Sequence, residues 1–285
     1  MKHCHFSILY NELPFLKEKL PFLYKFFDQL IFFDLNVGEV PPHFSTDGSH
    51  EYIRDFPDPQ GKITLIEKEN LDNVLAFCGD GSVEKQKMFA VGSSYVFPDM
   101  DVFWCTDMDE FFHSRLISKV ERILRERSEV NSIDLRHLMF WKSLSYTLST
   151  PTSDYSTLYA RICRHKPGNL YSHCAIHKQF PETFVIEDEC YYHFAWVGDT
   201  RVRSKIKHYS RPPTGNPKHK KMYDQYLDTV WDRHRDMREI DIPEGELYGY
   251  PHMHPNYLNS KMGIKSFNKG DLPPYINPQR LLNSL

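Results

Sequence analysis

Apolar and polar positions follow two different rhythms along the first part of the chain. Short apolar runs predict four strands, at residues 5–10, 29–35, 62–68 and 101–106. Between them, residues 13–27 and 82–95 carry apolar side chains at helical spacing, and Pro14 falls in the first turn of the earlier segment, where proline is favoured. Strands that alternate with helices in this way predict an α/β fold, with a mostly parallel central sheet and helices on its faces.

Further along the chain, strands dominate the pattern. Residues 114–129 predict an amphipathic helix that Ser114 caps. From Ile133 to Trp196 the chain is rich in aromatic and β-branched residues, which predicts several strands that are partly antiparallel. Residues 198–210 then predict another helix.

The last part of the chain has a different composition. From residue 211 it is rich in proline and aromatic residues, and its apolar spacing predicts one amphipathic helix, around 218–238. We therefore expect a domain of residues 1–210 and a helical or irregular extension of residues 211–285 that packs on it. Such an extension could serve as a lid over a binding site, as one wall of that site or as a dimer contact.

Size and charge exclude several classes of protein. The 285 residues are 40% hydrophobic, so the chain can bury a large core. Lysine and arginine number 35 against 38 aspartate and glutamate residues, without a dominant basic block, which argues against a nucleic acid as the main partner. No apolar run approaches the roughly 20 residues that cross a bilayer, and the first residues turn polar too soon for a signal peptide. We therefore expect a soluble, cytoplasmic protein with a small substrate.

The cysteines and histidines permit two interpretations. The six cysteines lack CxxC spacing and several lie in apolar runs, which predicts reduced thiols packed as small apolar side chains. Alternatively, CRH at residues 163–165 and HCAIH at residues 173–177 could together form a zinc site. Structural zinc sites usually have closer paired spacing, and these segments are predicted strands, so we favour reduced thiols.

One stretch, DVFWCTDMDEFF at residues 101–112, leads a strand of bulky apolar residues directly into three carboxylates. Asp107, Asp109 and Glu110 repel one another at this spacing unless a cation or abundant water lies between them. A solvated loop after a buried strand is one explanation, and a bound cation is the other.

Other polar residues also follow predicted strand ends. Asn11 and Glu12 follow the first strand, and Asp34 lies at the end of the second. Because ligands of parallel sheets bind beyond the carboxyl ends of the strands, one crevice could collect these residues together with the aspartates.

Aspartates on alternate residues of a turn can hold one divalent ion, which then binds phosphate oxygens and stabilises a departing phosphate. Two other metal-dependent classes use similar aspartates. A phosphatase of the haloacid dehalogenase type needs threonine or valine where this chain has Phe111, which argues strongly against it. A phosphodiesterase metal site is the other alternative.

Several stretches occur in an order that is more specific than any one of them. They are YNELPFLKEKL, QLIFFD, EKQKMFA, DVFWCTDMDEFF, and YYHFAWV followed by KIKHYS. Over roughly residues 5–210 the chain resembles the metal-dependent glycosyltransferases of the GT-A fold, most closely the bisecting N-acetylglucosaminyltransferase III-like family, glycosyltransferase family 17. Lys87 and Phe112 stand where that family usually has arginine and proline, and STDGSHEYI at residues 45–53 is more similar to the inverting family 2.

The resemblance implies a cofactor, two substrates and a set of site residues. The cofactor is a divalent ion, Mn²⁺ or Mg²⁺, with Asp107, Asp109 and His193 as its ligands. The donor is a UDP sugar, and the acceptor is a hydroxyl of a glycan or glycoprotein. The implied donor-binding residues are Tyr10, Asn11, Glu12, Asp34, Lys87, Asp107, Arg201 and Lys205.

An inverting transfer also needs a base that deprotonates the acceptor hydroxyl, and a carboxylate is sufficient for this. Glu189, four residues before His193, lies where the family tends to place an acid. Asp188 is the alternative, and in a strand it points to the opposite face.

Two other functions remain open from the sequence. A nucleotidyltransferase can share the fold and the metal, but we would expect a glycine-rich loop with a basic residue after the first strand, and ILYNELPF has none. A glycan-binding module without catalysis would bind a glycan but release no UDP. The sequence leaves open which sugar, acceptor and linkage are used.

Overall fold

The computed structural model of the chain describes residues 1–36, 43–66, 81–149, 158–167, 171, 182–210, 239–240 and 262–285. Its strands are β1 (His3–Leu9), β2 (Gln29–Asp34), β3 (Ile63–Ile66), β4 (Val102–Cys105), β5 (Glu110–Phe111), β6 (Ser132–Lys142), β7 (Tyr146–Ser149), β8 (Leu158–Arg164), β9 (Thr183–Val197), β10 (Glu239–Ile240) and β11 (Met262–Ser266). Its helices are α1 (Leu13–Phe26), α2 (Ser49–Arg54), α3 (Gly81–Ser94), α4 (Ser114–Glu126), α6 (Asp199–Ser210), the 3₁₀-helix η4 (Lys269–Asp271) and α8 (Pro278–Ser284).

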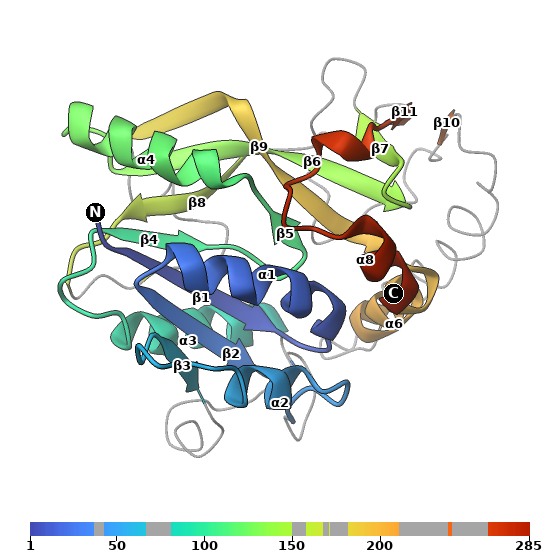
Figure 1. Cartoon of the computed structure of the whole chain (residues 1–285), viewed down its shortest axis with the longest axis horizontal. Coiled ribbons are helices and arrows are strands. Elements are labelled where there is room, and N and C mark those ends of the chain that lie inside the picture. Colours follow the sequence, from blue (N-terminus) through green and yellow to red (C-terminus); the bar gives the residue numbers. More distant parts are fainter. Residues whose placement is uncertain are drawn as a thin grey trace.

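The amino-terminal half of the sheet is parallel. Strands β3, β2, β1 and β4 lie side by side in this order, and each is parallel to its neighbour. Figure 1 shows α1 in front of these strands and α3 behind them. This half confirms the predicted α/β fold, in which a mostly parallel central sheet is flanked by helices.

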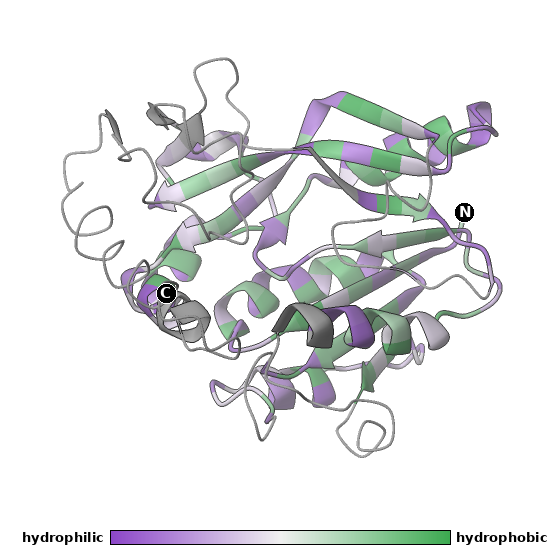
Figure 2. Cartoon of the chain, turned by 180° about the vertical axis from the view of Figure 1, so that it is seen from behind, coloured by the Kyte–Doolittle hydropathy of each residue, from purple (hydrophilic) through white to green (hydrophobic). Residues whose placement is uncertain are grey.

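Alternate residues of the parallel strands fill two separate cores. Phe6 of β1 and Phe103 of β4 pack with Met88 and Phe89 of α3 on one face. On the other face, Trp104 belongs to a larger core that includes residues of α1, α4 and α8. Figure 2 shows the central strands as mainly hydrophobic. Both faces are buried because a parallel sheet carries helices on each of them.

The second half of the sheet is mixed. β8 pairs antiparallel with β4, and β6 pairs antiparallel with β8. The 15-residue strand β9 runs parallel to β6, and the two-residue strand β5 pairs antiparallel with β9. These pairings confirm the expectation of partly antiparallel strands, and they bring β5 against the middle of β9.

The end of the chain folds back onto the first helix. The Tyr275 ring stacks on Phe22 of α1 at a centroid distance of 3.9 Å. Arg280 of α8 donates from Nη2 to Glu18 of α1 at 2.7 Å. Residues near the end of the chain therefore contact α1, and the division into a domain of residues 1–210 and an extension stays a prediction. The helix expected around 218–238 lies outside the described residues.

Three smaller expectations have different outcomes. The Ser114 cap is wrong, because extended backbone continues through His113 and makes that residue the cap of α4. The described cysteines, Cys4, Cys105, Cys163 and Cys190, are free and buried, as predicted. The HCAIH segment of the alternative zinc site lies outside the described residues.

No described helix combines the length and the apolar character needed to span a membrane.

Candidate active site

The chain leaves β4 at Cys105 and turns directly into β5. In this turn the Glu110 N–H donates to the Asp107 carbonyl at 3.1 Å, and the Asp107 N–H donates to the Glu110 carboxylate at 3.0 Å. We call residues 106–110 the acidic turn. Because β5 pairs with β9, Glu110 lies directly opposite His193.

Two arginines from distant elements neutralise the acidic turn. Arg161 of β8 donates from Nη2 to Glu110 at 2.7 Å and to Asp107 at 3.3 Å. Arg201 of α6 donates from Nη2 to Asp109 at 2.6 Å. Asp107 and Asp109 therefore contact different cations, which explains how three neighbouring carboxylates are tolerated there.

The buried side chain of Lys19 in α1 holds the start of the acidic turn. Lys19 of α1 donates to the Thr106 hydroxyl at 2.8 Å and to the Asp107 carbonyl at 2.5 Å. The hydroxyl of Thr106 also lies 2.6 Å from Nε2 of His5. Burial lowers the pKa of Lys19 to about 8, because an ammonium group loses its hydration in the core. Lys19 therefore fixes the path of the turn's backbone.

Two histidines face the turn. Nε2 of His193 lies 3.6 Å from Oδ1 of Asp109, and Nδ1 of His137 lies 3.7 Å from Oε1 of Glu110. Their rings are perpendicular, with centroids 5.3 Å apart. Burial lowers the pKa of His137 well below its ordinary value, so its ring is neutral near pH 7. Burial also raises the pKa of Glu110 to about 7.

The site continues to the end of β1 through Arg201. Its Nη2 also donates to Glu12, the residue before α1, at 2.8 Å. The guanidinium lies over the ring of Phe15, 4.7 Å from its centroid, and donates to the carbonyls of Phe194 and Ala195. The Arg201 side chain therefore lies against β9 and connects it to the residue before α1.

The end of β2 connects to the same edge. Ser45 donates from its hydroxyl to Asp34 at 2.5 Å and accepts from the Asn11 N–H at 2.8 Å. His50 contacts the other oxygen of Asp34 at 3.1 Å. Asn11 has a φ of 54°, a left-handed conformation that asparagine tolerates, and its side chain accepts from the Thr46 N–H. Residues at the ends of β1, β2 and β4 are therefore linked by contacts, as their positions in the sequence predict.

The remaining predicted donor residues lie in three settings. The Tyr10 ring packs edge-on against His43, with centroids 5.5 Å apart. Lys87 is half-buried on α3, which covers the opposite face of the sheet from α1. The side chain of Lys205 lies outside the described residues. The roles of all three in donor binding stay predictions.

The two predicted base residues contact α4. Glu189 accepts from Arg115 at 2.5 Å, and Asp188 pairs with Lys119. Glu189 is buried, whereas the side chain of Asp188 is 75% exposed. At about 3.3 Å per strand residue, Glu189 is roughly 13 Å along β9 from His193. Its role as the base stays a prediction.

Sequence reasoning missed three residues of the site. Lys19 could have been found, because it shares the buried helix face with Phe15 and Leu23, at i−4 and i+4. Arg161 had a weaker signal, a charged residue inside the apolar run LYARIC. His137 gave no signal of its own, since its partners come from β5 and β9.

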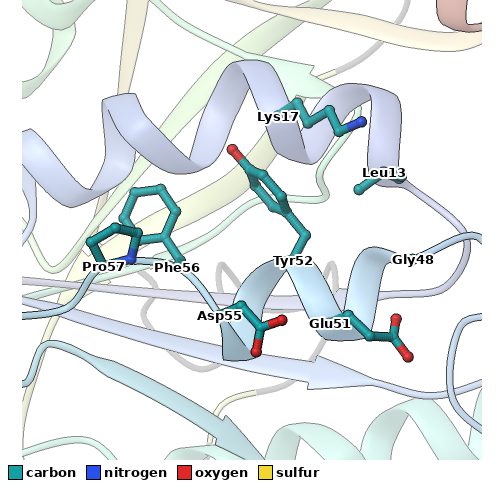
Figure 3. Close-up of a pocket in the computed structure, with 8 residues that line it drawn as sticks. All are labelled: Leu13, Lys17, Gly48, Glu51, Tyr52, Asp55, Phe56 and Pro57. Atoms are coloured by element: carbon teal, nitrogen blue, oxygen red, sulfur yellow. The ribbon is translucent and has the colours of Figure 1, made fainter.

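A separate pocket of about 430 Å³ lies between α1 and α2. Lys17 and Tyr52 are among its lining residues, together with the carboxylates Glu51 and Asp55 (Figure 3). No residue of the acidic turn lines it, so it is a feature of the surface apart from the site described above.

The side-chain oxygen of Asp109 and the ring nitrogen of His193 are suitable ligands for one divalent ion. Two ligands of one ion, each about 2.1 Å from it, can lie as far apart as the 3.6 Å between Asp109 and His193. Carboxylate oxygen together with imidazole nitrogen suits Mn²⁺ and similar ions. Of the two predicted aspartate ligands, Asp109 is the one that lies beside His193, and Asp107 contacts Arg161.

No protein-family model and no curated protein matches the chain. Among solved structures, it is similar to residues 1–349 of TarS from S. aureus, at 13% identity and a TM-score of 0.40, over 82% of this chain and 74% of that one. A second similar structure is 4-diphosphocytidyl-2C-methyl-D-erythritol synthase from Anaerococcus prevotii, at 10% identity and a TM-score of 0.36, over 65% and 86% of the two chains. A third, described as mannose-1-phosphate geranyltransferase from Thermus thermophilus, has 7% identity and a TM-score of 0.29, over 80% and 65% of the two chains. TM-scores of 0.40 and below establish neither a family nor an activity for this chain.

Proposed function

We propose that the chain is a divalent-metal-dependent, inverting glycosyltransferase of the GT-A fold that transfers a sugar from a UDP sugar to a hydroxyl of a glycan. The observation that carries the proposal is the acidic turn at the carboxyl end of β4, with Asp109 beside His193 and linked through Arg201 to Glu12. Carboxyl ends of parallel strands are the usual place for a ligand in such a sheet. The ordered resemblance to family 17 supports the same activity.

The charges of the site suit a diphosphate with its ion. Arg201 supplies a cation, and Asp109 with His193 supplies oxygen and nitrogen ligands. When bound, the ion would act as a Lewis acid that stabilises negative charge on the departing phosphate. Arg201 is paired with Glu12 and Asp109, so a diphosphate would compete with these carboxylates for its donors.

The nucleoside end of the donor belongs with the end of β2 in this proposal. Asp34 is fully buried and is held by Ser45 and His50. Burial raises the pKa of this carboxyl, although the hydrogen bonds from Ser45 oppose the shift. Asp34 would orient Asn11 and the neighbouring loop toward the base or ribose, while Tyr10 would line the base.

The acceptor needs a base, and we propose Glu189 for it, because it is the buried member of the Asp188–Glu189 pair. Its carboxylate is ordered by Arg115. A carboxylate that a partner holds in one orientation is better placed to take a proton than one that rotates freely in solvent.

A nucleotidyltransferase is the competing enzyme class. Such an enzyme would need basic groups close to the phosphates after β1. The turn between β1 and α1 carries Asn11 and Glu12, and both are engaged with neighbouring side chains. A turn after β1 that carries Glu12 in place of a basic residue favours a sugar donor whose diphosphate is neutralised by an ion.

A donor screen tests the proposal. Purified chain is mixed with each sugar nucleotide and Mn²⁺, and free UDP is measured with and without EDTA. We expect UDP release from one or a few UDP sugars and its loss with EDTA. Glycan binding without any UDP release would indicate a binding module, and pyrophosphate release from a nucleoside triphosphate would indicate a nucleotidyltransferase.

A further inference from the structure

Three strands place a carboxylate and two imidazoles at one point in the interior. Glu110 of β5, His137 of β6 and His193 of β9 each offer a ligand atom, and these atoms lie within 4.8 Å of one another. We propose that Glu110, His137 and His193 are the inner ligands of the divalent ion and that Asp109 lies outside them, so this set replaces the pair of Asp109 and His193 given above as direct ligands. This rests on the proposed function and deepens it by assigning the ligands, and the binding of the ion is measurable without any transfer reaction.

Strand register makes the three side chains converge. Glu110 is paired with His193 across β5 and β9, so both point to the same face. On β6, His137 is two residues from Met139, the partner of His193, and therefore shares that face. Ligands of one ion at about 2.1 Å lie roughly 3–4 Å apart, so the three atoms need to close by about 1 Å.

The proposed inner ligands already have outer partners. Arg161 donates to one oxygen of Glu110 at 2.7 Å, and the Asp107 N–H donates to the other at 3.0 Å. Each carboxylate oxygen has two lone pairs, so a hydrogen bond leaves one for an ion. Asp109 lies 3.6 Å from His193. Metal ligands are commonly oriented by such second partners.

A buried hydroxyl beside the set also indicates a ligand. Tyr191 is fully buried on β9, its ring centroid lies 5.1 Å from that of His137, and its hydroxyl has no hydrogen-bond partner among the described residues. Buried hydroxyls almost always have a partner, since leaving one without a hydrogen bond is costly. An ion that carries a water ligand next to His137 would provide it.

The ligand chemistry selects the ion. Two imidazole nitrogens and one carboxylate suit Mn²⁺, Co²⁺ or Zn²⁺, whereas Mg²⁺ prefers oxygen ligands. The side chain of His193 is 14% exposed and His137 is fully buried, so the ion would enter past His193. The site is therefore an inward extension of the acidic turn.

The test uses Co²⁺, whose visible absorption reports its ligands. The EDTA-treated chain of residues 1–285 is titrated with Co²⁺ alone and again in the presence of excess Mg²⁺. His137→Gln should weaken Co²⁺ binding at least about 10-fold. His113→Gln, a histidine on the Tyr192 hydroxyl outside the ligand set, is the matched control and should bind as the wild type does.

His137→Gln changes a buried side chain, so circular dichroism and thermal unfolding must show that it folds. X-ray absorption of the Co²⁺-loaded wild type provides a second measurement, and two imidazole ligands are expected. One imidazole, unchanged Co²⁺ binding by a folded His137→Gln variant, or equal competition by Mg²⁺ would overturn the site.

The two proposals fail separately. Two imidazole ligands in a chain that releases no UDP from any sugar nucleotide would support this site and remove the proposed function. One imidazole together with EDTA-sensitive UDP release would overturn this site and leave the function standing.

Discussion

Two arginine–glutamate pairs of similar length lie in very different surroundings. Arg161 contacts Glu110 at 2.7 Å, with side chains 3% and 0% exposed. Arg115 contacts Glu189 at 2.5 Å, but the arginine is 64% exposed. Distance alone would rank the pairs as equals.

Burial separates the two pairs. The charges of Arg161 and Glu110 are removed from water, so each needs the other, and losing one partner leaves an uncompensated buried charge. Arg115 keeps most of its hydration, because its side chain is 64% exposed, so the pair with Glu189 contributes less to folding than the fully buried pair. A charge pair that stays buried at a cost to stability is a candidate for a functional role, and Arg161 and Glu110 both belong to the surroundings of the acidic turn.

The largest expected effect is on folding. Arg161→Met should lower the free energy of unfolding by about 3–5 kcal/mol, because Glu110 is left buried without its cation. Arg115→Met is the matched control and should cost at most about 1 kcal/mol. Urea unfolding of both variants measures the difference. Equal losses of unfolding free energy would show that burial does not distinguish the two pairs.

The second prediction concerns Glu189, the buried partner of the exposed Arg115. If Glu189 is the base, Glu189→Gln should lower transfer by about 10²- to 10⁴-fold, while donor affinity stays within a few-fold of the wild type. Asp188→Asn is the matched control, since it removes only a surface pair with Lys119 and should leave transfer unchanged. A loss below about 10-fold in Glu189→Gln would make Glu189 a structural partner of Arg115 instead.

The third prediction concerns the acidic turn itself. Asp109→Asn keeps the size of the side chain but removes a charge beside His193 and Arg201, so metal-dependent turnover should fall at least about 100-fold. UDP release at saturating Mn²⁺ measures the loss. Near-normal turnover that EDTA still abolishes would exclude Asp109 from the site.

The smallest effect is expected for the hydroxyl of Tyr275, which holds the backbone just after β5. The Tyr275 hydroxyl donates to the Phe112 carbonyl at 3.0 Å and accepts from the Phe112 N–H at 3.3 Å. Tyr275→Phe keeps the ring stacked on Phe22 but leaves these backbone groups without their partner, so unfolding free energy should fall by about 1–3 kcal/mol. An unchanged urea midpoint would show that Phe112 does not depend on this hydroxyl.

The local pattern of apolar residues was sufficient to predict the strands of the parallel half of the sheet. The periods of apolar residues differ between strand and helix, and they are set by backbone geometry within each segment. The cap of α4 was missed because the preceding strand, and not the side chain of Ser114, decides where the helix begins. Residues at strand ends were predictable for the same local reason, including Asp34 and the aspartates of the acidic turn.

Which arginines contact the acidic turn could be identified only from the tertiary structure. Arg161 is 51 residues from Glu110, and Arg201 is 92 residues from Asp109. Alternate residues of a strand share one face of the sheet, and this can be predicted from the sequence. The residues that lie opposite them are decided by the pairing of β5 with β9 and of β6 with β9.

The sequence by itself therefore determined the α/β fold class, the position of the acidic turn and the identity of its carboxylates, since these depend on neighbours along the chain. Only the tertiary structure decided that Asp107 and Asp109 have separate arginines and that His137 lies beside Glu110. Those contacts arise from register between strands far apart in sequence. Burial then makes them strong, because charges that have left water respond mainly to the groups packed against them.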